Sequence, residues 1–349
     1  MVNILAKKIE KYALTNWLAS LASDGKLFGP IKNSGGWGRI EAVHNIGDAF
    51  DEKMSCKEIY LPREQTMFIL DAKKPFETMQ TVLPSFPDGS VLWGIHPCDA
   101  RALDLIRRVF NEGKYRDIFF NTAWDGIIRI AVGCTEPQPS CFCTSLAGGS
   151  PFGTQGVDIL ATEIGESWIM ENITSRGEAL IREMPDAEES DLEKLAGIKR
   201  EATGKVDSSI PTDIADNMLE LFDDESIWEN LGETCIGCGT CTSVCPGCYC
   251  FDIEDELNGE EVRRYRKWDS CIHKSFTMHE SGYNPRATQK QRIRQRIFHK
   301  LSFFAIRYDE TQLCVGCGRC VNRCPQGIDI RDIAKKVFAK TVSDEEKQP

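Results

Sequence analysis

The sequence predicts an α+β protein in which an N-terminal α/β domain with a mixed sheet, residues 1–200, precedes an α-helical domain, residues 201–349. Two observations indicate this. Short apolar runs alternate with amphipathic stretches over residues 66–206, which is typical of an α/β domain with a partly parallel sheet. An acidic stretch with few hydrophobic residues follows at 185–195, and most cysteines come after it, among segments of helical character. We therefore expect the domain boundary between that stretch and Pro211.

In the N-terminal domain, apolar residues at helical spacing predict an amphipathic helix over residues 5–21. Residues 28–43 contain a glycine cluster without the preceding strand and following helix of a dinucleotide-binding loop, so we interpret them as turns between short strands. Residues 214–228 predict a further amphipathic helix that leads to Cys235. The remaining predicted elements are buried strands at 67–70, 91–95 and 126–132, and helices at 100–110 and 175–184.

Two cysteine motifs with identical spacing stand in the second domain. Residues 235–246 and 314–325 both read C-x2-C-x2-C-x3-C-P, the spacing that holds a cubane iron–sulfur cluster. Three cysteines bind one cluster, and in two-cluster ferredoxins the fourth binds the other. Zinc sites use two cysteine pairs and have no need of the further two cysteines. We therefore expect two 4Fe-4S clusters, the first held by Cys235, Cys238, Cys241 and Cys324 and the second by Cys314, Cys317, Cys320 and Cys245.

The segment between the motifs is expected to be helical. Residues 286–307 carry seven basic residues, no acidic residue and an apolar stripe, which predicts an amphipathic helix. We expect its positive charge to offset the anionic clusters and the acidic N-terminal domain, or to dock a partner subunit. Nucleic-acid binding is disfavoured because the chain is acidic and no aromatic platform for bases accompanies the helix. Arg319 and Arg323, inside the second motif, are expected to raise the potential of the nearer cluster.

The other cysteines fall into two groups. The first group follows predicted strands of the N-terminal domain, where α/β folds place ligands, and a third iron–sulfur cluster, a zinc ion and plain buried thiols are the alternatives there. The second group lies near the first motif and is expected to supply packing thiols, stand-by ligands or contacts that tune a cluster. The first group is Cys98, Cys134, Cys141 and Cys143, with Asp99 as an alternative ligand; the second is Cys248, Cys250 and Cys271, and Cys56 stands alone.

With these residues in view, the chain resembles the iron–sulfur beta subunit of cytoplasmic NAD(P)-linked hydrogenases (sulfhydrogenases), a family of 4Fe-4S dicluster proteins found also in anaerobic sulfite reductase. The resemblance covers residues 91–330. It implies that the C-terminal domain is similar to α-helical dicluster ferredoxins. It also implies a subunit that transfers electrons between a flavin subunit that oxidises NAD(P)H and a catalytic redox subunit (hydrogenase, sulfite or sulfur reductase, or heterodisulfide-reductase-like module), with soluble ferredoxin as a further partner. Its most specific stretches are GIHPCDARAL at 94–103, CFCTS at 141–145, CPGCYCFD at 245–252, WDSC at 268–271 and GYNPR at 282–286.

Composition and motifs limit the function further. A net charge of -11 argues against general binding to nucleic acid or anionic membranes. The sequence has no run of about 18 apolar residues and no signal peptide at residues 1–24, and its clustered thiols need a reducing interior, so we expect a cytoplasmic protein of an anaerobe with no membrane span.

No catalytic residue is expected, because the five histidines are scattered and no P-loop or hydrolase motif is present. Whether the chain is an enzyme in itself stays open. The alternatives to an electron carrier are a catalytic reductase subunit with a substrate-binding cluster in the N-terminal domain, and a redox scaffold or sensor.

Overall fold

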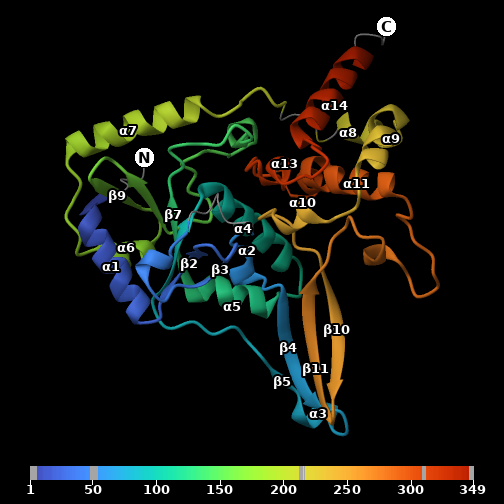
Figure 1. Ribbon diagram of the computed structural model, residues 1–349, viewed down its shortest axis with the longest axis horizontal. Coiled ribbons are helices and arrows are strands. Elements are labelled where there is room, and N and C mark those ends of the chain that lie inside the picture. Colours follow the sequence, from blue (N-terminus) through green and yellow to red (C-terminus); the bar gives the residue numbers. More distant parts are fainter. Residues whose placement is uncertain (1–5, 48–53, 212–214, 216, 309–311, 346–349) are drawn as a thin grey trace. The chain divides into compact units, whose positions relative to one another are not determined.

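The computed structural model describes residues 6–47, 54–211, 215, 217–308 and 312–345 (Figure 1). The chain forms two compact units, and each combines segments from both sides of the predicted boundary at residue 200. Because these units are not divided by a single cut along the sequence, the domain boundary at residue 200 stays a prediction. The first unit draws on Met1–Glu136, Pro151–Gly204 and Phe251–Trp268, and the second on Pro137–Ser150, Lys205–Cys250 and Asp269–Pro349.

The first unit is built on a seven-stranded mixed sheet, as predicted. Its strand order is β1-β9-β8-β7-β6-β2-β3. The central strands β2, β6, β7 and β8 pair in parallel, while β1, β9 and β3 are attached antiparallel. The strands are β1 Ala6–Glu10, β2 Leu27–Ile31, β3 Gly36–Arg39, β6 Ser90–Ile95, β7 Ile127–Val132, β8 Ile159–Glu163 and β9 Ser167–Asn172.

The core of this unit follows from the apolar central strands. Val91, Ile130 and Ile159 on adjacent strands are fully buried in one hydrophobic cluster. The same region holds a buried ion pair, in which Arg129 Nη2 lies 2.8 Å from Asp158 Oδ2. The accompanying helices are α1 Lys11–Ser23, α2 Lys57–Tyr60, α3 Pro75–Thr78, α4 Pro97–Phe110, α5 Ile118–Gly126, α6 Ser175–Ile181 and α7 Glu189–Gly204, with the 3-10 turn η1 Val43–Asn45.

Residues 251–268 form a β-hairpin, so the expectation that the whole segment between the motifs is helical is wrong. The hairpin strands β10 Phe251–Asn258 and β11 Glu261–Trp268 pair with each other. Strand β11 also pairs with β4 Glu64–Asp71, and β4 pairs with β5 Gln80–Thr81, which gives a four-stranded antiparallel sheet (Figure 1). The turn contains Asn-Gly, with Gly259 at φ 65°, and cross-strand ion pairs such as Arg264–Asp255 join the polar faces. These pairs explain how so charged a segment forms strands.

Smaller differences concern the ends of predicted elements. Residues 6–10 of the helix predicted at 5–21 form strand β1, and residue 5 lies outside the described residues. The helix predicted at 214–228 is two short helices, and Ile214 lies outside the described residues. The acidic stretch predicted as a connector is partly helical, because α7 begins at Glu189. The short strands around the glycine cluster are confirmed by the β2–β3 pairing.

The second unit is mostly helical. Its core joins Phe142, Trp228, Ile297, Phe298 and Val337 in one buried cluster. The basic helix predicted at 286–307 is confirmed as a continuous run in which a π-helical turn separates two α-helical stretches. The elements are η2 Cys143–Ser145, α8 Asn217–Glu220, α9 Glu225–Thr234, α10 Thr240–Ser243, η3 Ser275–Thr277, α11 Gln289–Phe298, the π-turn η4 His299–Phe303, α12 Phe304–Arg307, α13 Arg319–Asn322 and α14 Ile330–Glu345.

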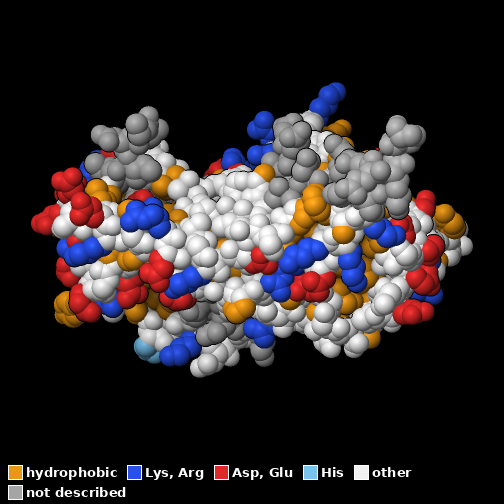
Figure 2. Space-filling model, turned by 90° about the horizontal axis from the view of Figure 1, so that it is seen from above, with side chains coloured by type: hydrophobic (Ala, Val, Ile, Leu, Met, Phe, Trp, Pro, Cys, Tyr) orange, Lys and Arg blue, Asp and Glu red, His pale blue; other side chains and the backbone are white. Residues whose placement is uncertain are grey.

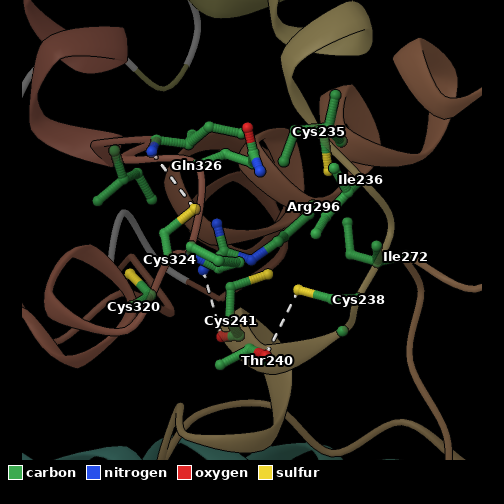
Figure 3. Close-up of a pocket in the computed structure, with 15 residues that line it drawn as sticks. Cys235, Ile236, Cys238, Thr240, Cys241, Ile272, Arg296, Cys320, Cys324 and Gln326 are labelled. Carbon is green, nitrogen blue, oxygen red and sulfur yellow. Dashed lines mark hydrogen bonds between the residues drawn. The ribbon is translucent and has the colours of Figure 1, made fainter.

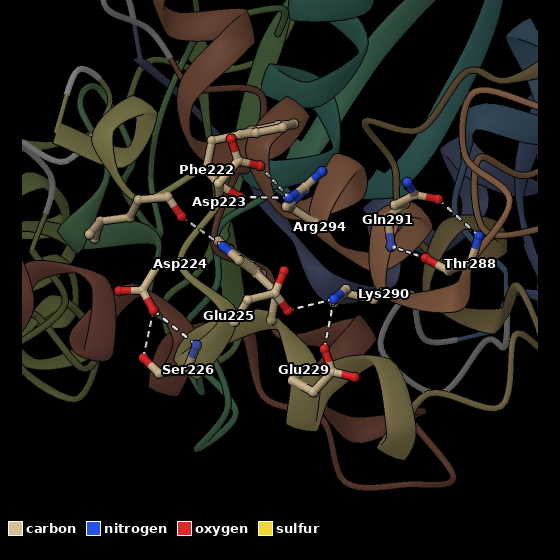
Figure 4. Close-up of polar contacts among 12 residues, drawn as sticks. Phe222, Asp223, Asp224, Glu225, Ser226, Glu229, Thr288, Lys290, Gln291 and Arg294 are labelled. Carbon is tan, nitrogen blue, oxygen red and sulfur yellow. Dashed lines mark hydrogen bonds and ion pairs between the residues drawn. The ribbon is translucent and has the colours of Figure 1, made fainter.

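The outer basic residues of α11 pair with acidic residues that precede or lie on α9 (Figure 4). Lys290 Nζ lies 2.5 Å from Glu225 and 2.7 Å from Glu229, and these carboxylates raise its pKa. Arg294 donates to the Phe222 carbonyl at 2.8 Å and stacks on the Phe222 ring. The helix is therefore not a free basic surface. On the face seen in Figure 2, acidic and basic side chains are interspersed in the same way.

Candidate metal centre

The two cysteine motifs adopt the same local conformation. In each, a four-residue helix that carries the third cysteine begins after a glycine in the left-handed region, Gly239 (φ 71°) or Gly318 (φ 68°). A Cβ at these glycines would also lie too close to neighbours, at 2.6 Å from His273 Nε2 and 2.3 Å from Ser140 Oγ, respectively. Glycine is therefore required twice at the same place in a repeated loop.

Cysteines of both motifs line one cavity of the second unit (Figure 3). Its apolar wall includes Ile272 and Ile293, its buried cation is Arg296, and Cys320 borders it as well. Cys324 comes from the second motif, so the cavity brings the two motifs together. The four cysteines predicted to hold the first cluster all line it: Cys235, Cys238, Cys241 and Cys324.

Two of these sulfurs already accept hydrogen bonds. Gln289 Nε2 donates to Cys235 Sγ at 3.2 Å, and the backbone N–H of Ile328 donates to Cys324 Sγ at 3.3 Å. Hydrogen bonds of this kind stabilise a thiolate and tune an iron–sulfur cluster. Within the described part of the chain, no three His, Cys, Asp or Glu side chains converge on a point that could hold a single ion. Cysteines that surround a cavity instead fit a polynuclear cluster, in which each sulfur binds a different iron.

The cysteines predicted for the second cluster also lie near one another. Burial, with the nearby sulfurs of Cys320 and Cys245, raises the pKa of Cys314 to about 11. Burial and the same two sulfurs raise the pKa of Cys317, against the opposing charge of Arg319. A buried thiol with a raised pKa keeps its proton until a metal displaces it, so a cluster held by these cysteines would release protons as it binds.

A segment distant in sequence closes the loop of the second motif. The backbone N–H of Phe142 donates to Gly316 O at 2.8 Å, and Cys141 Sγ lies 3.8 Å from Cys317 O. A Cβ at Gly316 would lie 2.5 Å from the backbone of Cys143. The sequence places residues 137–150 in the predicted α/β domain and does not predict this packing, since only the Gly-rich character of both segments indicates a close approach.

The four cysteines of the predicted third site divide between the two units. Cys98 and Cys134 belong to the first unit, and Cys141 and Cys143 belong to the second. Asp99 is fully buried, and its Oδ2 accepts from the backbone N–H of His96, which caps α4. A third cluster at these four cysteines stays a prediction.

Another group of cysteines is assembled within the second unit. Cys271 is buried in a small hydrophobic cluster against which Cys250, Cys235 and Cys241 pack. A hydrogen bond with the Cys250 thiol, together with burial and the nearby sulfur of Cys248, raises the pKa of Cys271. These cysteines therefore form a shell beside the first cavity. Cys56 is buried in the first unit.

The comparisons with known proteins agree with the cysteine geometry. Residues 234–328 match the 4Fe-4S dicluster domain family. Sulfhydrogenase 2 subunit beta of Pyrococcus furiosus is 27% identical over 312 residues, which cover 87% of this chain and 90% of that protein. No solved structure matches the chain. The predicted resemblance to iron–sulfur hydrogenase beta subunits is therefore confirmed, as is an α+β protein with a dicluster segment in its C-terminal part.

The family match and the relative therefore support an iron–sulfur protein whose role is electron transfer. Its dicluster segment contains both cysteine motifs and all the cysteines that line the cavity. None of the helices in the described part of the chain has the length and apolar character needed to cross a membrane.

Proposed function

We propose that this protein is an electron-transfer subunit that relays single electrons through two 4Fe-4S clusters. The observation that carries the proposal is the position of Cys324, which lines the same cavity as the first three cysteines of the other motif. A ligand exchanged between motifs is the arrangement of two-cluster ferredoxins. When bound, the clusters supply one-electron redox chemistry, and the protein supplies their ligands, hydrogen bonds and local charge.

The proposed ligands follow from the cavity and the buried sulfurs. Cys235, Cys238, Cys241 and Cys324 would hold the first cluster, and Cys314, Cys317, Cys320 and Cys245 would hold the second. Gln289 and the backbone of Ile328 would donate to sulfurs of the first cluster. The apolar residues of the cavity limit access of water to it.

We propose as partners a flavin subunit that oxidises NAD(P)H and a catalytic redox subunit. The relative from Pyrococcus furiosus is named as subunit beta of a sulfhydrogenase, which supports membership of a complex. A nicotinamide delivers two electrons together, and a flavin is needed to divide them for one-electron carriers. A reducing cytoplasm would keep the cysteines as ligands.

The experiment that tests the proposal is anaerobic purification followed by iron and sulfide analysis and electron paramagnetic resonance (EPR) of the reduced protein. Two clusters predict about eight irons per chain and two reducible cubane signals. About twelve irons would add a third cluster and support a site at Cys98, Cys134, Cys141 and Cys143 or beside the first cavity. Clusters that no low-potential donor reduces would favour a scaffold or sensor, and reduction of sulfite or a disulfide without partners would favour a catalytic subunit.

A further inference from the structure

Two buried cations stand on one face of the basic helix. Arg296 on α11 is 4% exposed, and Lys300, four residues later in the π-turn η4, is 2% exposed. No carboxylate among the described residues forms an ion pair with either side chain. Arg296 Nε is buried without a hydrogen-bond partner. Like charges at this spacing repel, and burying an unpaired charge costs several kcal/mol, so the fold alone does not explain them.

Both cations face the cysteines of the two motifs. Arg296 lines the first cavity, and its Nη2 lies 3.4 Å from the Cys241 carbonyl oxygen (Figure 3). Lys300 Nζ donates to the Gly247 carbonyl at 2.8 Å, two residues after Cys245, and the Lys300 carbonyl accepts from the backbone N–H of Cys314 at 3.2 Å. Arg296 therefore lies beside the predicted ligands of the first cluster and Cys320 of the second, whereas Lys300 lies beside other predicted ligands of the second.

Cysteine ligands of a bound cluster are thiolates, and thiolate charge opposes the cost of burying both cations. Burial by itself would lower the pKa of Arg296, but nearby sulfurs, Cys241 and Cys320 foremost, raise it above its usual value. Burial likewise opposes the charge of Lys300, while the sulfurs of Cys245, Cys248 and Cys314 raise its pKa. Both side chains therefore lie where the negative charge of a bound cluster and its thiolates would be concentrated. Lys300 lies in a π-turn, a feature frequent at functional sites, whereas Arg296 lies on the preceding α-helix α11.

We propose that Arg296 and Lys300 set the reduction potentials of the two clusters, Arg296 mainly that of the first and Lys300 mainly that of the second. This inference rests on the proposed function. Reduction adds negative charge to a site that is already anionic, and a buried cation stabilises the reduced form, so its presence raises the potential. Of the two arginines that the sequence indicated for this role, Arg319 is buried beside Cys317 and adds to the charge there, whereas Arg323 is exposed and screened by solvent.

The test is an EPR-monitored redox titration of the full chain, purified anaerobically, in the variants Arg296→Gln and Lys300→Gln. Each substitution should make the midpoint potential of its own cluster more negative by at least about 59 mV. For one electron, this shift corresponds to a tenfold change in the equilibrium constant of reduction. The matched control is Lys290→Gln, which removes a cation of the same helix that is paired with carboxylates at the surface. The control should leave both midpoints near those of the wild type.

The outcomes separate this inference from the proposed function. A wild-type protein without reducible clusters would refute the proposed function itself. Two reducible clusters whose midpoints are the same in the wild type, Arg296→Gln and Lys300→Gln would refute only the role of the cations. If Arg296→Gln loses iron, the variant Arg296→Lys is measured instead. Retained iron in Arg296→Lys, with a midpoint near that of the wild type, supports the role of the positive charge. Loss of iron in Arg296→Lys overturns that role.

Discussion

Gly316→Ala tests whether residues 137–150 close the loop of the second motif. Gly316 has φ 67°, and a Cβ there would lie 2.5 Å from both N and Cα of Cys143 and 2.7 Å from the Phe142 carbonyl carbon. The left-handed conformation costs an alanine about 1–2 kcal/mol. Overpacking against backbone adds about 1–3 kcal/mol. We therefore expect the free energy of unfolding of the second unit to fall by about 2–5 kcal/mol.

The matched control is Gly282→Ala. Gly282 has φ 80°, and a Cβ added there would have nothing within 4 Å, so only the conformational cost of about 1–2 kcal/mol applies. Denaturant unfolding of both variants under anaerobic conditions, followed by tryptophan fluorescence and iron content, measures the difference. Gly316→Ala should be the less stable variant and should hold less iron. Equal losses of stability in the two variants would refute the packing of the segment on this loop.

Three further predictions address the interior of each unit. Gln289→Leu should move the midpoint of the first cluster to more negative potential, because the hydrogen bond to Cys235 Sγ is lost, and an unchanged titration would contradict this. Arg129→Met should destabilise the first unit by about 3–5 kcal/mol in denaturant unfolding, because it leaves Asp158 buried without its partner, and a loss under about 1 kcal/mol would argue against the pair. Burial, with nearby cations, lowers the pKa of His299 to about 4, so the unfolded state binds more protons between pH 6.5 and 4, and stability should fall by about 3 kcal/mol as the pH falls through that range. His299→Gln should lose this dependence, and parallel stability curves for the two proteins would contradict the assignment.

The sequence could predict the features that depend on local pattern. Regular cysteine spacing identifies the two motif loops, because a cubane cluster needs thiolates at that spacing, and the paired glycines fit the left-handed turns of the loops. The apolar runs at 91–95 and 126–132 identify central strands, since strands buried on both faces are continuously hydrophobic. The basic helix was also predictable from its apolar stripe.

The features that the sequence could not predict depend on partners far along the chain. The hairpin at 251–268 is mostly polar, and its strands are joined by cross-strand ion pairs and by pairing with β4, although Asn258-Gly259 was a signal for its turn. Cys141 and Cys143 follow a strand of the first unit, but packing on Gly316 places them in the second. The burial of Arg296 could not be predicted from the sequence, because a basic residue on an amphipathic helix is usually exposed to solvent.

The exchange of ligands between the motifs is tested most directly by comparing alanine variants in EPR spectra of the reduced protein. Cys324→Ala should lose the same cluster signal as Cys235→Ala, although Cys324 belongs to the other motif. Cys245→Ala should lose the same signal as Cys314→Ala. If Cys324→Ala and Cys314→Ala instead lose one and the same signal, each motif binds its own cluster and the exchange does not occur.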